Sequence, residues 1–444
     1  MNGQKVIDGD VPLNLNIKKN GTILIISKNQ SYLTHGIHKF PAKFFPELPR
    51  YLIRKYSKSG ETVLDPMCGS GTVILEAMLE GRNAVGVDID PIAEMISTAK
   101  TTPINYKTLE KCRSIIFREI LKKVSSNYEP KIPDFHYREK WFEPFVLREL
   151  SIIKESIDSI KANGYTKSEA ERLHRFFSVV FSSIVRDVSN ADPHCTRTVI
   201  RKKLKKNTKE WDAVLKFLAN AEKQIDHMQE FYDKYNSFGS KPRVRIIKSD
   251  ARNTGIKPKS IDLAVTSPPY CNAVDYPRTH QLEMYWLGLI NGGTLADVKR
   301  NYIGTETVYS NEYSEMGKTG HKQLDAFVSD LFKKDKRISF IVHKFFVDME
   351  KNLKEVHSLL KDGGHYCVVI GNNTIKGSTL KSHEIIRDIA TSENVGFKLD
   401  NMFFSGVIKH FIKIPRKERM SGEWVIILKK PLTSQSMIGN LRSS

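Results

Sequence analysis

The chain has 444 residues, 40% of them hydrophobic and 27% charged, a globular composition with length for about two or three domains. It has no run of about 18 apolar residues, no apolar leader and no Cys-x-x-Cys pair among its five cysteines, so we expect a cytoplasmic protein without membrane span, disulfide framework or structural zinc. The formal net charge of +20 favours a polyanionic partner such as nucleic acid over a basic protein that has none.

The part of the chain before residue 100 alternates between strand and helix signals. Apolar residues alternate over 13–28 around Asn20-Gly21, which suits a tight turn with positive φ, so we predict a hairpin in an N-terminal extension over 1–30. The elements predicted next are a helix over 46–56, a strand over 62–64, a helix over 73–79 and a strand over 84–87. This alternation is typical of a parallel sheet.

The alternation stops near residue 100, and apolar residues then recur at helical spacing. One helical face is marked by Leu173, Phe176, Phe177, Val180, Phe181 and Ile184, and another by Trp211, Val214, Leu215 and Leu218. A strand-helix-strand unit takes on the order of thirty residues, so we predict a large helical insertion over 101–240. The strands predicted after it lie over 244–247, 261–265, 366–370, 402–414 and 424–428.

A glycine-rich loop separates the strand over 62–64 from its helix. It consists of Asp65, Pro66, Met67, Cys68, Gly69, Ser70, Gly71 and Thr72. Glycines there let the backbone approach a ligand at the carboxyl edge of a parallel sheet, although a plain tight turn also explains one Gly-x-Gly. The loop lacks the Gly-Lys-Ser/Thr ending of a nucleotide-phosphate loop. Asp88, at the end of the next strand, suits the two hydroxyls of a ribose, with a helix cap as the alternative.

The glycine loop resembles the cofactor loop of amino-methyltransferases, written in that family as Asp-Pro-Phe/Met-Cys-Gly-Ser-Gly-Thr. The resemblance implies an α/β, Rossmann-like fold that has a seven-stranded, mostly parallel sheet with one antiparallel strand and binds S-adenosylmethionine. It also implies that Asp88 takes the ribose and that Asp250, where a strand-end cap is the alternative, meets the adenine. The residues expected to bind the cofactor are Lys43, Phe44, Asp65, Met67, Cys68, Gly69, Ser70, Gly71, Thr72, Asp88, Ile89, Asp250, Ala251 and Thr266.

A second motif ends the strand over 261–265, and its expected catalytic residues are Ser267, Pro268, Pro269 and Tyr270. Prolines have no N–H, so nearby carbonyls stay free as acceptors, while Ser267 adds a hydroxyl and Tyr270 a stacking face. Such a set suits a planar base with an amino group; a proline turn with a core tyrosine is the structural alternative. The stretch resembles motif IV of DNA amino-methyltransferases, where Thr/Ser-Ser-Pro-Pro-Tyr is typical of cytosine-N4 enzymes and Asp/Asn-Pro-Pro-Tyr/Phe of adenine-N6 enzymes.

Two looser matches complete the resemblance. Residues 38–49 are similar to motif X, which closes over the methionine end of the cofactor, and residues 359–371 to the strand pairing that completes the sheet. The methyltransferase domain is therefore expected over 31–100 and 241–430, with the insertion as the DNA-recognition domain. Cytosine-C5 chemistry is disfavoured because no Pro-Cys nucleophile ends the fourth strand, and Cys271 is expected to be a packing residue.

A dense cationic run in the insertion is the expected phosphate-binding segment, with a solvated helix face as the alternative. The cations expected to bind nucleic acid are Arg197, Arg201, Lys202, Lys203, Lys205 and Lys206, together with Arg278. A polar turn over 186–192 is a candidate for base-edge contacts, and residues 272–278 are expected beside a flipped base. The histidines His35, His38, His174 and His194 do not fall at metal-ligand spacing, so we predict no metal.

These features predict a site-specific methyltransferase that acts on the N4 amine of a flipped cytosine in double-stranded DNA. Adenine-N6 methylation of DNA and guanosine-N2 methylation of RNA are the alternatives, because the RNA enzymes share a very similar glycine loop and a Pro-Pro-Tyr. Those enzymes usually carry an N-terminal RNA-binding module, whereas only about thirty residues precede the motif X segment here. A DNA-binding protein on a decayed enzyme fold is disfavoured by the intact motifs, and a cognate restriction endonuclease is a further candidate partner.

Overall fold

The computed structural model describes residues 5–162, 164–200, 207–271, 275–290, 295–407 and 422–432. The strands are β1 (Lys5–Asp8), β2 (Thr22–Ile26), β3 (Thr62–Asp65), β4 (Asn83–Asp88), β5 (Val244–Lys248), β6 (Ile261–Thr266), β7 (Leu360–Ile370), β8 (Asn373–Ile375), β9 (Ser378–Leu380), β10 (Lys398–Val407) and β11 (Gly422–Lys429). The α-helices are α1 (Glu47–Tyr56), α2 (Thr72–Leu79), α3 (Pro91–Thr101), α4 (Tyr106–Val124), α5 (Arg138–Trp141), α6 (Pro144–Asp158), α7 (Lys167–Val188), α8 (Asp212–Asn236), α9 (Tyr276–Thr279), α10 (Gln281–Trp286), α11 (Leu295–Arg300), α12 (Lys322–Lys334), α13 (Lys336–Leu359) and α14 (Ser382–Thr391). Short 3-10 helices are η1 (Leu33–Gly36), η2 (Ser159–Ala162) and η3 (Ser310–Tyr313).

Within the described residues, nine strands form one mixed sheet in the order β1-β2-β10-β11-β7-β6-β3-β4-β5. Only β11 runs against its neighbours, pairing antiparallel with β10 and β7, while the other pairs are parallel. The seven strands from β10 to β5 match the predicted sheet with its single antiparallel strand, so the α/β, Rossmann-like fold class is confirmed. The predicted number of strands was too small by two, because β2 and β1 extend the sheet beyond β10.

The predicted N-terminal hairpin is wrong. Residues 13–19 form no strand, and β1 pairs parallel with β2. Asn20 does adopt a positive φ of 61°, and Gly21 N donates to the Lys18 carbonyl at 2.9 Å, so the tight turn exists. It leads into β2, which lies between β1 and β10 and pairs in parallel with both, so no antiparallel hairpin forms. β10 satisfies the backbone groups on one side of β2 from the far end of the chain.

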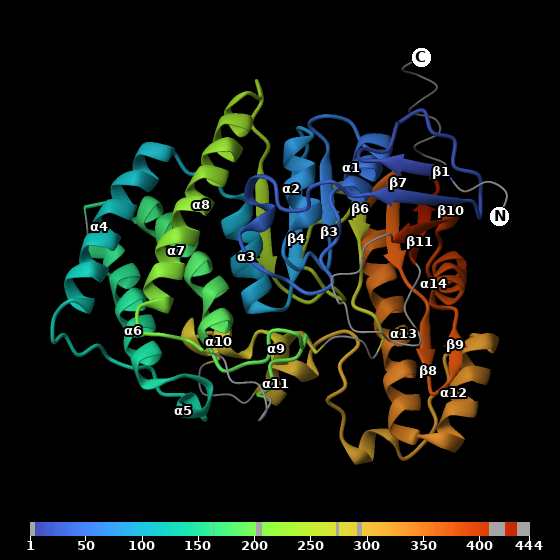
Figure 1. The fold of residues 1–444 in the computed structure, drawn as a ribbon. Coiled ribbons are helices and arrows are strands. Elements are labelled where there is room, and N and C mark those ends of the chain that lie inside the picture. Colours follow the sequence, from blue (N-terminus) through green and yellow to red (C-terminus); the bar gives the residue numbers. More distant parts are fainter. Residues whose placement is uncertain are drawn as a thin grey trace.

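The central strands are buried on both faces, as parallel strands in an α/β sheet usually are. Val63 and Leu263 pack with α1 and α2 on one face. Their chain neighbours Leu64 and Ala264 pack on the other face with α12, α13 and α14. Helices therefore cover both faces, and the strands converge on a carboxyl edge that lies toward the bottom of Figure 1.

The predicted insertion over 101–240 is helical and contains α4 to α8, on the left of Figure 1. Its hydrophobic core is continuous with Leu75 of α2 and Ile96 of α3, so it packs directly on the sheet layer. The predicted face of α7 is entirely buried and comprises Leu173, Phe176, Phe177, Val180, Phe181 and Ile184.

The predicted face of α8 is partly wrong. Val214 is fully buried, but Leu215 is 59% exposed and Trp211 37% exposed. The buried stripe instead continues from Val214 through Phe217 and Ala221, three and four residues apart as helix geometry requires. Leu215 lies one position off that stripe and faces solvent.

The sequence analysis did not predict the second helical segment, which lies between β6 and β7. It contains α9 to α13, and α12 with α13 extends below the sheet at the lower right of Figure 1. The carboxyl edge thus lies between the insertion and this segment. None of the described helices is long and apolar enough to cross a membrane.

Candidate functional site

One pocket opens at the carboxyl edge of β3, β4 and β6. Its empty space is about 880 Å³, part of which is open solvent at the mouth. The predicted cofactor residues that line it are Lys43, Phe44, Asp65, Met67, Cys68, Gly69, Ser70, Thr72, Asp88, Ile89, Asp250 and Ala251. Ser267 and Pro269 of the catalytic motif line the same pocket, so the structure brings the two motifs together.

Four predicted site residues are not among those that line the pocket: Gly71, Thr266, Pro268 and Tyr270. Gly71 has a φ of 75°, and a Cβ there would lie 2.8 Å from the Ser97 Cβ on α3, so its missing side chain serves helix packing. Thr266 is buried, and its hydroxyl donates to Asp65 Oδ1 at 2.7 Å. The threonine thus ties the catalytic motif to the glycine loop from behind.

Two acidic side chains form the floor of the pocket. Asp88 accepts hydrogen bonds from the backbone N–H of Gly69 at 2.7 Å and of Asp90 at 2.9 Å. Burial, and then the charge of Asp90, raises the pKa of Asp88 to about 7. Burial likewise raises the pKa of Asp65 to about 7 against the hydrogen bonds that it accepts. Hydrogen-bond donors supplied by a ligand would therefore stabilise the ionised form of both carboxyls.

Asp90 and Tyr302 also line this side of the pocket. Asp90 Oδ1 caps α3 by accepting from Ile92 N at 3.0 Å. Burial raises the pKa of Asp90, and a side-chain interaction with the Tyr302 hydroxyl opposes this shift. A ligand with hydroxyl and amino groups fits these two side chains.

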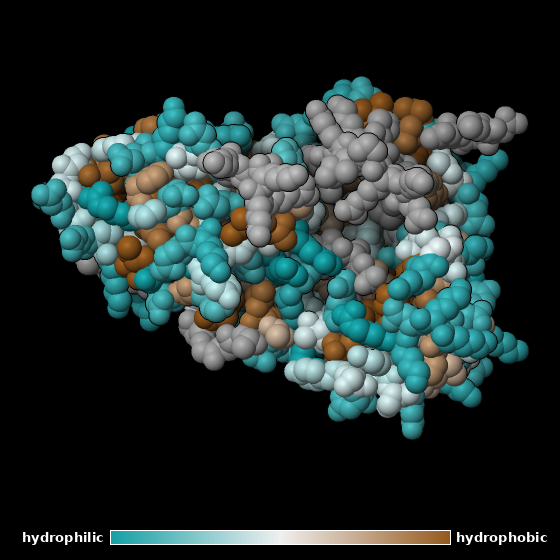
Figure 2. Space-filling model, turned by 60° about the horizontal axis from the view of Figure 1, so that its bottom comes forward, coloured by the Kyte–Doolittle hydropathy of each residue, from teal (hydrophilic) through white to brown (hydrophobic). Residues whose placement is uncertain are grey.

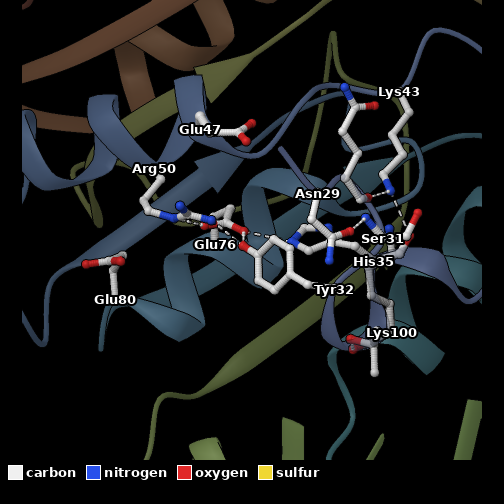
Figure 3. Close-up of polar contacts among 12 residues, drawn as sticks. Asn29, Ser31, Tyr32, His35, Lys43, Glu47, Arg50, Glu76, Glu80 and Lys100 are labelled. Carbon is white, nitrogen blue, oxygen red and sulfur yellow. Dashed lines mark hydrogen bonds and ion pairs between the residues drawn. The ribbon is translucent and has the colours of Figure 1, made fainter. Parts of the chain in front are cut away.

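Lys43 forms the opposite polar wall. Its Nζ donates to the carbonyls of Gln30 and His35, at 2.7 Å each (Figure 3). Burial lowers the pKa of Lys43 to about 8. An ammonium has three N–H groups, so one remains for a ligand, and a carboxylate is the acceptor that best suits it.

Asp250 lines the pocket but already has a strong partner. Arg252 donates to its two oxygens through N and Nε at 2.8 Å and through Nη2 at 2.6 Å. Burial opposes ionisation of Asp250, but the Arg252 hydrogen bonds prevail and lower its pKa. A contact between Asp250 and an adenine therefore stays a prediction.

An aromatic wall closes the pocket. Its lining rings, Phe40 and Tyr276, belong to the segments over 38–49 and 272–278, which the sequence analysis expected near the ligands without naming these two rings. The ring of Phe40 stacks on Tyr276, with centroids 5.7 Å apart, and on His280, with centroids 5.1 Å apart. A Cβ on Gly69 would lie 3.2 Å from Phe40 Cε1, so the glycine lets this wall approach the loop. The other lining residues that the sequence analysis did not propose are Ala42, Pro66, Val73, Asn301 and Ile303.

The catalytic motif lies where β6 ends. Ser267 and Pro269 face the pocket, whereas the half-buried Tyr270 donates its hydroxyl hydrogen bond to Glu423 on β11. Cys271 is 1% exposed and packs in the core, as predicted. Residues 272–274, expected beside a flipped base, lie outside the described residues.

Of the predicted nucleic-acid contacts, Arg197 and Arg278 are described and both are exposed. Their segments are joined, because the Thr198 hydroxyl donates to the Thr279 carbonyl at 2.7 Å. The remaining members of the run, Arg201, Lys202, Lys203, Lys205 and Lys206, lie outside the described residues.

The polar turn over 186–192 makes internal contacts. Arg186 donates to the Thr196 carbonyl at 3.1 Å, and Asp187 pairs with Lys39 at 2.8 Å. Contacts of this turn with base edges stay a prediction. Among the described residues, no group of three His, Cys, Asp or Glu side chains is placed to hold a metal ion.

Comparison with known proteins gives a consistent set of relatives. The DNA methylase family model for N6 and N4 methyltransferases matches residues 14–99. The type II methyltransferase M.MvaI of Kocuria varians is 27% identical over 390 residues, which cover 83% of this chain and 84% of that protein. M.BsoBI of Geobacillus stearothermophilus is 25% identical over 422 residues, covering 84% and 80%. A solved SAM-dependent methyltransferase from Methanosarcina mazei aligns with a TM-score of 0.30 at 11% identity, covering 86% of this chain and 98% of that one.

Proposed function

Since this chain belongs to the DNA amino-methyltransferases, we propose that it moves a methyl group from S-adenosylmethionine to the N4 amine of a flipped cytosine in double-stranded DNA. The observation that carries the proposal is the single pocket that joins the glycine loop and Asp88 to Ser267 and Pro269. A cofactor site and an amine-orienting motif thus share one cavity at the sheet edge.

The pocket residues suit the two ends of the cofactor. Asp88, with Asp90 and Tyr302 beside it in the pocket lining, would hold the adenosine hydroxyls and amine. The free N–H of Lys43 would hold the methionine carboxylate, with the backbone of Gly69 close by. When bound, S-adenosylmethionine supplies an electrophilic sulfonium methyl group.

The catalytic motif orients the target amine. Ser267 Oγ and the carbonyls that the two prolines leave unbonded accept N–H groups, which directs the nitrogen lone pair toward the pocket. The Tyr270 ring stacks on the flipped base, a contact worth about 1–3 kcal/mol. Positioning and exclusion of water supply most of the rate gain in such a transfer, without a covalent protein intermediate.

Electrostatics supports a nucleic acid as the polymer. The net charge of +20 draws a polyanion to the molecule. Arg197 and Arg278 lie on joined segments next to the catalytic motif, where phosphates flanking a flipped base would lie. Figure 2, which turns the bottom of Figure 1 forward, shows a largely hydrophilic surface on the insertion and on the α12–α13 side. We place the duplex between these two regions, with the insertion as the recognition domain.

The hydroxyl at Ser267 favours cytosine over adenine. Adenine enzymes of the family generally have a carboxylate or amide at this position. The neighbouring Thr266 hydroxyl is bonded to Asp65, which leaves Ser267 as the motif's hydroxyl at the pocket. A cognate restriction endonuclease that cleaves the same unmethylated site is the partner that we propose.

Nucleoside analysis tests the proposal. The purified chain is incubated with S-adenosylmethionine and either double-stranded DNA or transfer RNA, and the digested nucleosides are weighed by mass spectrometry. We expect N4-methylcytosine in the DNA. N6-methyladenine alone would refute the cytosine assignment and keep the mechanism, whereas methylation of transfer RNA alone would refute both the base and the polymer.

A further inference from the structure

The start of β11 lies at the catalytic edge because this strand runs antiparallel to its neighbours. In its register, Glu423 lies opposite Ser405 of β10, and Trp424 lies opposite Ile370, the last residue of β7. A Cβ at Gly422 would lie 2.3 Å from the Ser405 carbonyl oxygen, so a glycine is needed for the strand to enter here. The register thus brings an acidic side chain to the end of the sheet where β6 presents the catalytic motif.

Glu423 accepts a hydrogen bond from the Tyr270 hydroxyl, although 153 positions separate the two residues in the chain. Both side chains are partly buried. Burial raises the pKa of the Tyr270 hydroxyl, and a side-chain interaction with Ser267 opposes this shift. With its hydroxyl taken, Tyr270 offers a target base only the face and edge of its ring.

Strand β11, which carries Glu423, is held in place by side-chain contacts of the next residue. Trp424 stacks on His383 with ring centroids 4.2 Å apart and an interplanar angle of 1°. His383 Nδ1 in turn lies 2.7 Å from Asn372 Oδ1. These contacts fix the backbone beside Glu423, so its carboxylate provides a stationary acceptor for the tyrosine.

The fold alone gives no reason for a carboxylate at this place. Backbone pairing already joins β11 to β7, and β7 to β6. Burial raises the pKa of Glu423, which shows that ionisation there is opposed by its surroundings. An acidic side chain whose pKa is shifted by burial and which lies next to a reactive motif is characteristic of functional sites.

We propose that Glu423 is a positioning residue of the methyl-transfer site, which holds the Tyr270 ring in the plane against which the target base stacks. The proposal rests on the function proposed above, because it assigns the base to the Tyr270 ring. Glu423 acts through the tyrosine hydroxyl and touches neither base nor cofactor.

Steady-state methylation of duplex DNA by four variants tests this role: Glu423→Leu, Glu423→Gln, Tyr270→Phe and the double variant Glu423→Leu/Tyr270→Phe. Loss of a hydrogen bond to a charged group predicts a roughly tenfold or larger fall in kcat for Glu423→Leu and for Tyr270→Phe. Glu423→Gln keeps an acceptor and recovers most of that loss. The double variant falls little below Tyr270→Phe, because the hydroxyl that Glu423 holds is already absent.

Cofactor affinity and a matched control separate positioning from loss of folding. S-adenosylmethionine affinity stays within about twofold of wild type in each variant, since Glu423 lies outside the cofactor pocket. The exposed Glu393 provides the control, as Glu393→Leu removes an acid without touching the motif.

An unchanged kcat in Glu423→Leu, or equal losses from that change with and without the tyrosine hydroxyl, would overturn the role of Glu423. If Glu423→Leu does not fold, a wild-type kcat in Tyr270→Phe overturns it. A wild-type chain that methylates no DNA would contradict the proposed function as well, whereas an active wild type with additive variants contradicts only the inference.

Discussion

Two buried carboxylates, one on helix α2 and one across the glycine loop from it, differ in their hydrogen-bond donors. Glu76, on the helix, is fully buried, and its oxygens accept from His35 Nε2 and Arg50 Nε at 2.7 Å each and from the Tyr32 hydroxyl (Figure 3). Burial opposes its ionisation, but these donors prevail and lower the pKa of Glu76. Asp88, across the glycine loop, has backbone donors, and burial raises its pKa to about 7.

The different donors indicate different roles: Glu76 is a structural charge, whereas we propose that Asp88 serves a ligand. Cationic and hydroxyl donors from the segment over 32–50 satisfy Glu76 within the protein, and this cluster holds that segment on α2. Lys43 and Phe40, which line the pocket, belong to the same segment. The Glu76 cluster therefore supports the pocket, while Asp88 is the proposed acceptor for donors from the cofactor.

The largest expected effect is on folding. Glu76→Ala leaves Arg50 and His35 without their acceptor, and breaking a buried pair in this way costs about 3–5 kcal/mol of unfolding free energy. Urea denaturation measures it. Glu80→Ala is the matched control, because its pair with Arg54 is partly exposed and is expected to contribute about 1 kcal/mol or less. Equal losses of unfolding free energy in the two variants would show that Glu76 is no more important for stability than a partly exposed ion pair.

The next effect is on cofactor affinity. Asp88→Ala removes a charged acceptor from the ribose site and should weaken S-adenosylmethionine binding by about 1.5–3 kcal/mol. Calorimetry without DNA measures it, with the exposed Asp330→Ala as control. Unchanged affinity in Asp88→Ala would mean that the ribose lies elsewhere.

A smaller effect is expected from pH. Cofactor hydroxyls donate to the ionised form of Asp88, whose pKa is about 7. Binding should therefore strengthen as pH rises toward 7, by up to about tenfold per pH unit below it, and level off above. Titration calorimetry between pH 5.5 and 8 follows this change, and Asp88→Asn should flatten it. A slope that persists in Asp88→Asn would assign the titration to another group such as Asp65.

The smallest effects concern single phosphate contacts. Arg197→Ala and Arg278→Ala should each flatten the slope of log K against log salt for DNA binding by about 0.9. Replacing Lys202, Lys203 and Lys205 together should flatten it by about 2.7, with sequence preference retained. Lys58→Ala, an exposed cation before β3 at the opposite edge, is the control. Unaltered slopes would make these cations a solvated surface.

The sequence predicted those parts of the site that local chemistry dictates. The loop from Asp65 to Thr72 and the motif from Ser267 to Tyr270 have residue types that few other structures require, and both lie at the pocket edge. The mostly parallel sheet was predicted from the strand and helix alternation together with the family resemblance, whereas its strand order was not predicted. The hairpin failed because the Asn20-Gly21 turn is a local signal, whereas β2 pairs in parallel with β1 and with β10, which lies at the other end of the chain.

Non-local contributions to the site left weaker signals. Tyr276 and Tyr302 reach the pocket from a helical segment whose sequence has no motif. Glu423 left only a weak signal, as an acid directly before the strand predicted over 424–428. In the structure it is partly buried, and charged residues are seldom buried without a partner. The partner, Tyr270, emerged only with the register of β11.

The central claim is that the motif from Ser267 to Tyr270 performs methyl transfer next to the cofactor pocket. Single-turnover transfer of a labelled methyl group into duplex DNA tests it in Ser267→Ala, with Ser260→Ala at the start of the same strand as control. We predict a loss of about 10²-fold in rate for Ser267→Ala, because the target amine is no longer oriented, with unchanged cofactor affinity. A Ser267→Ala chain that transfers at the wild-type rate would contradict the account.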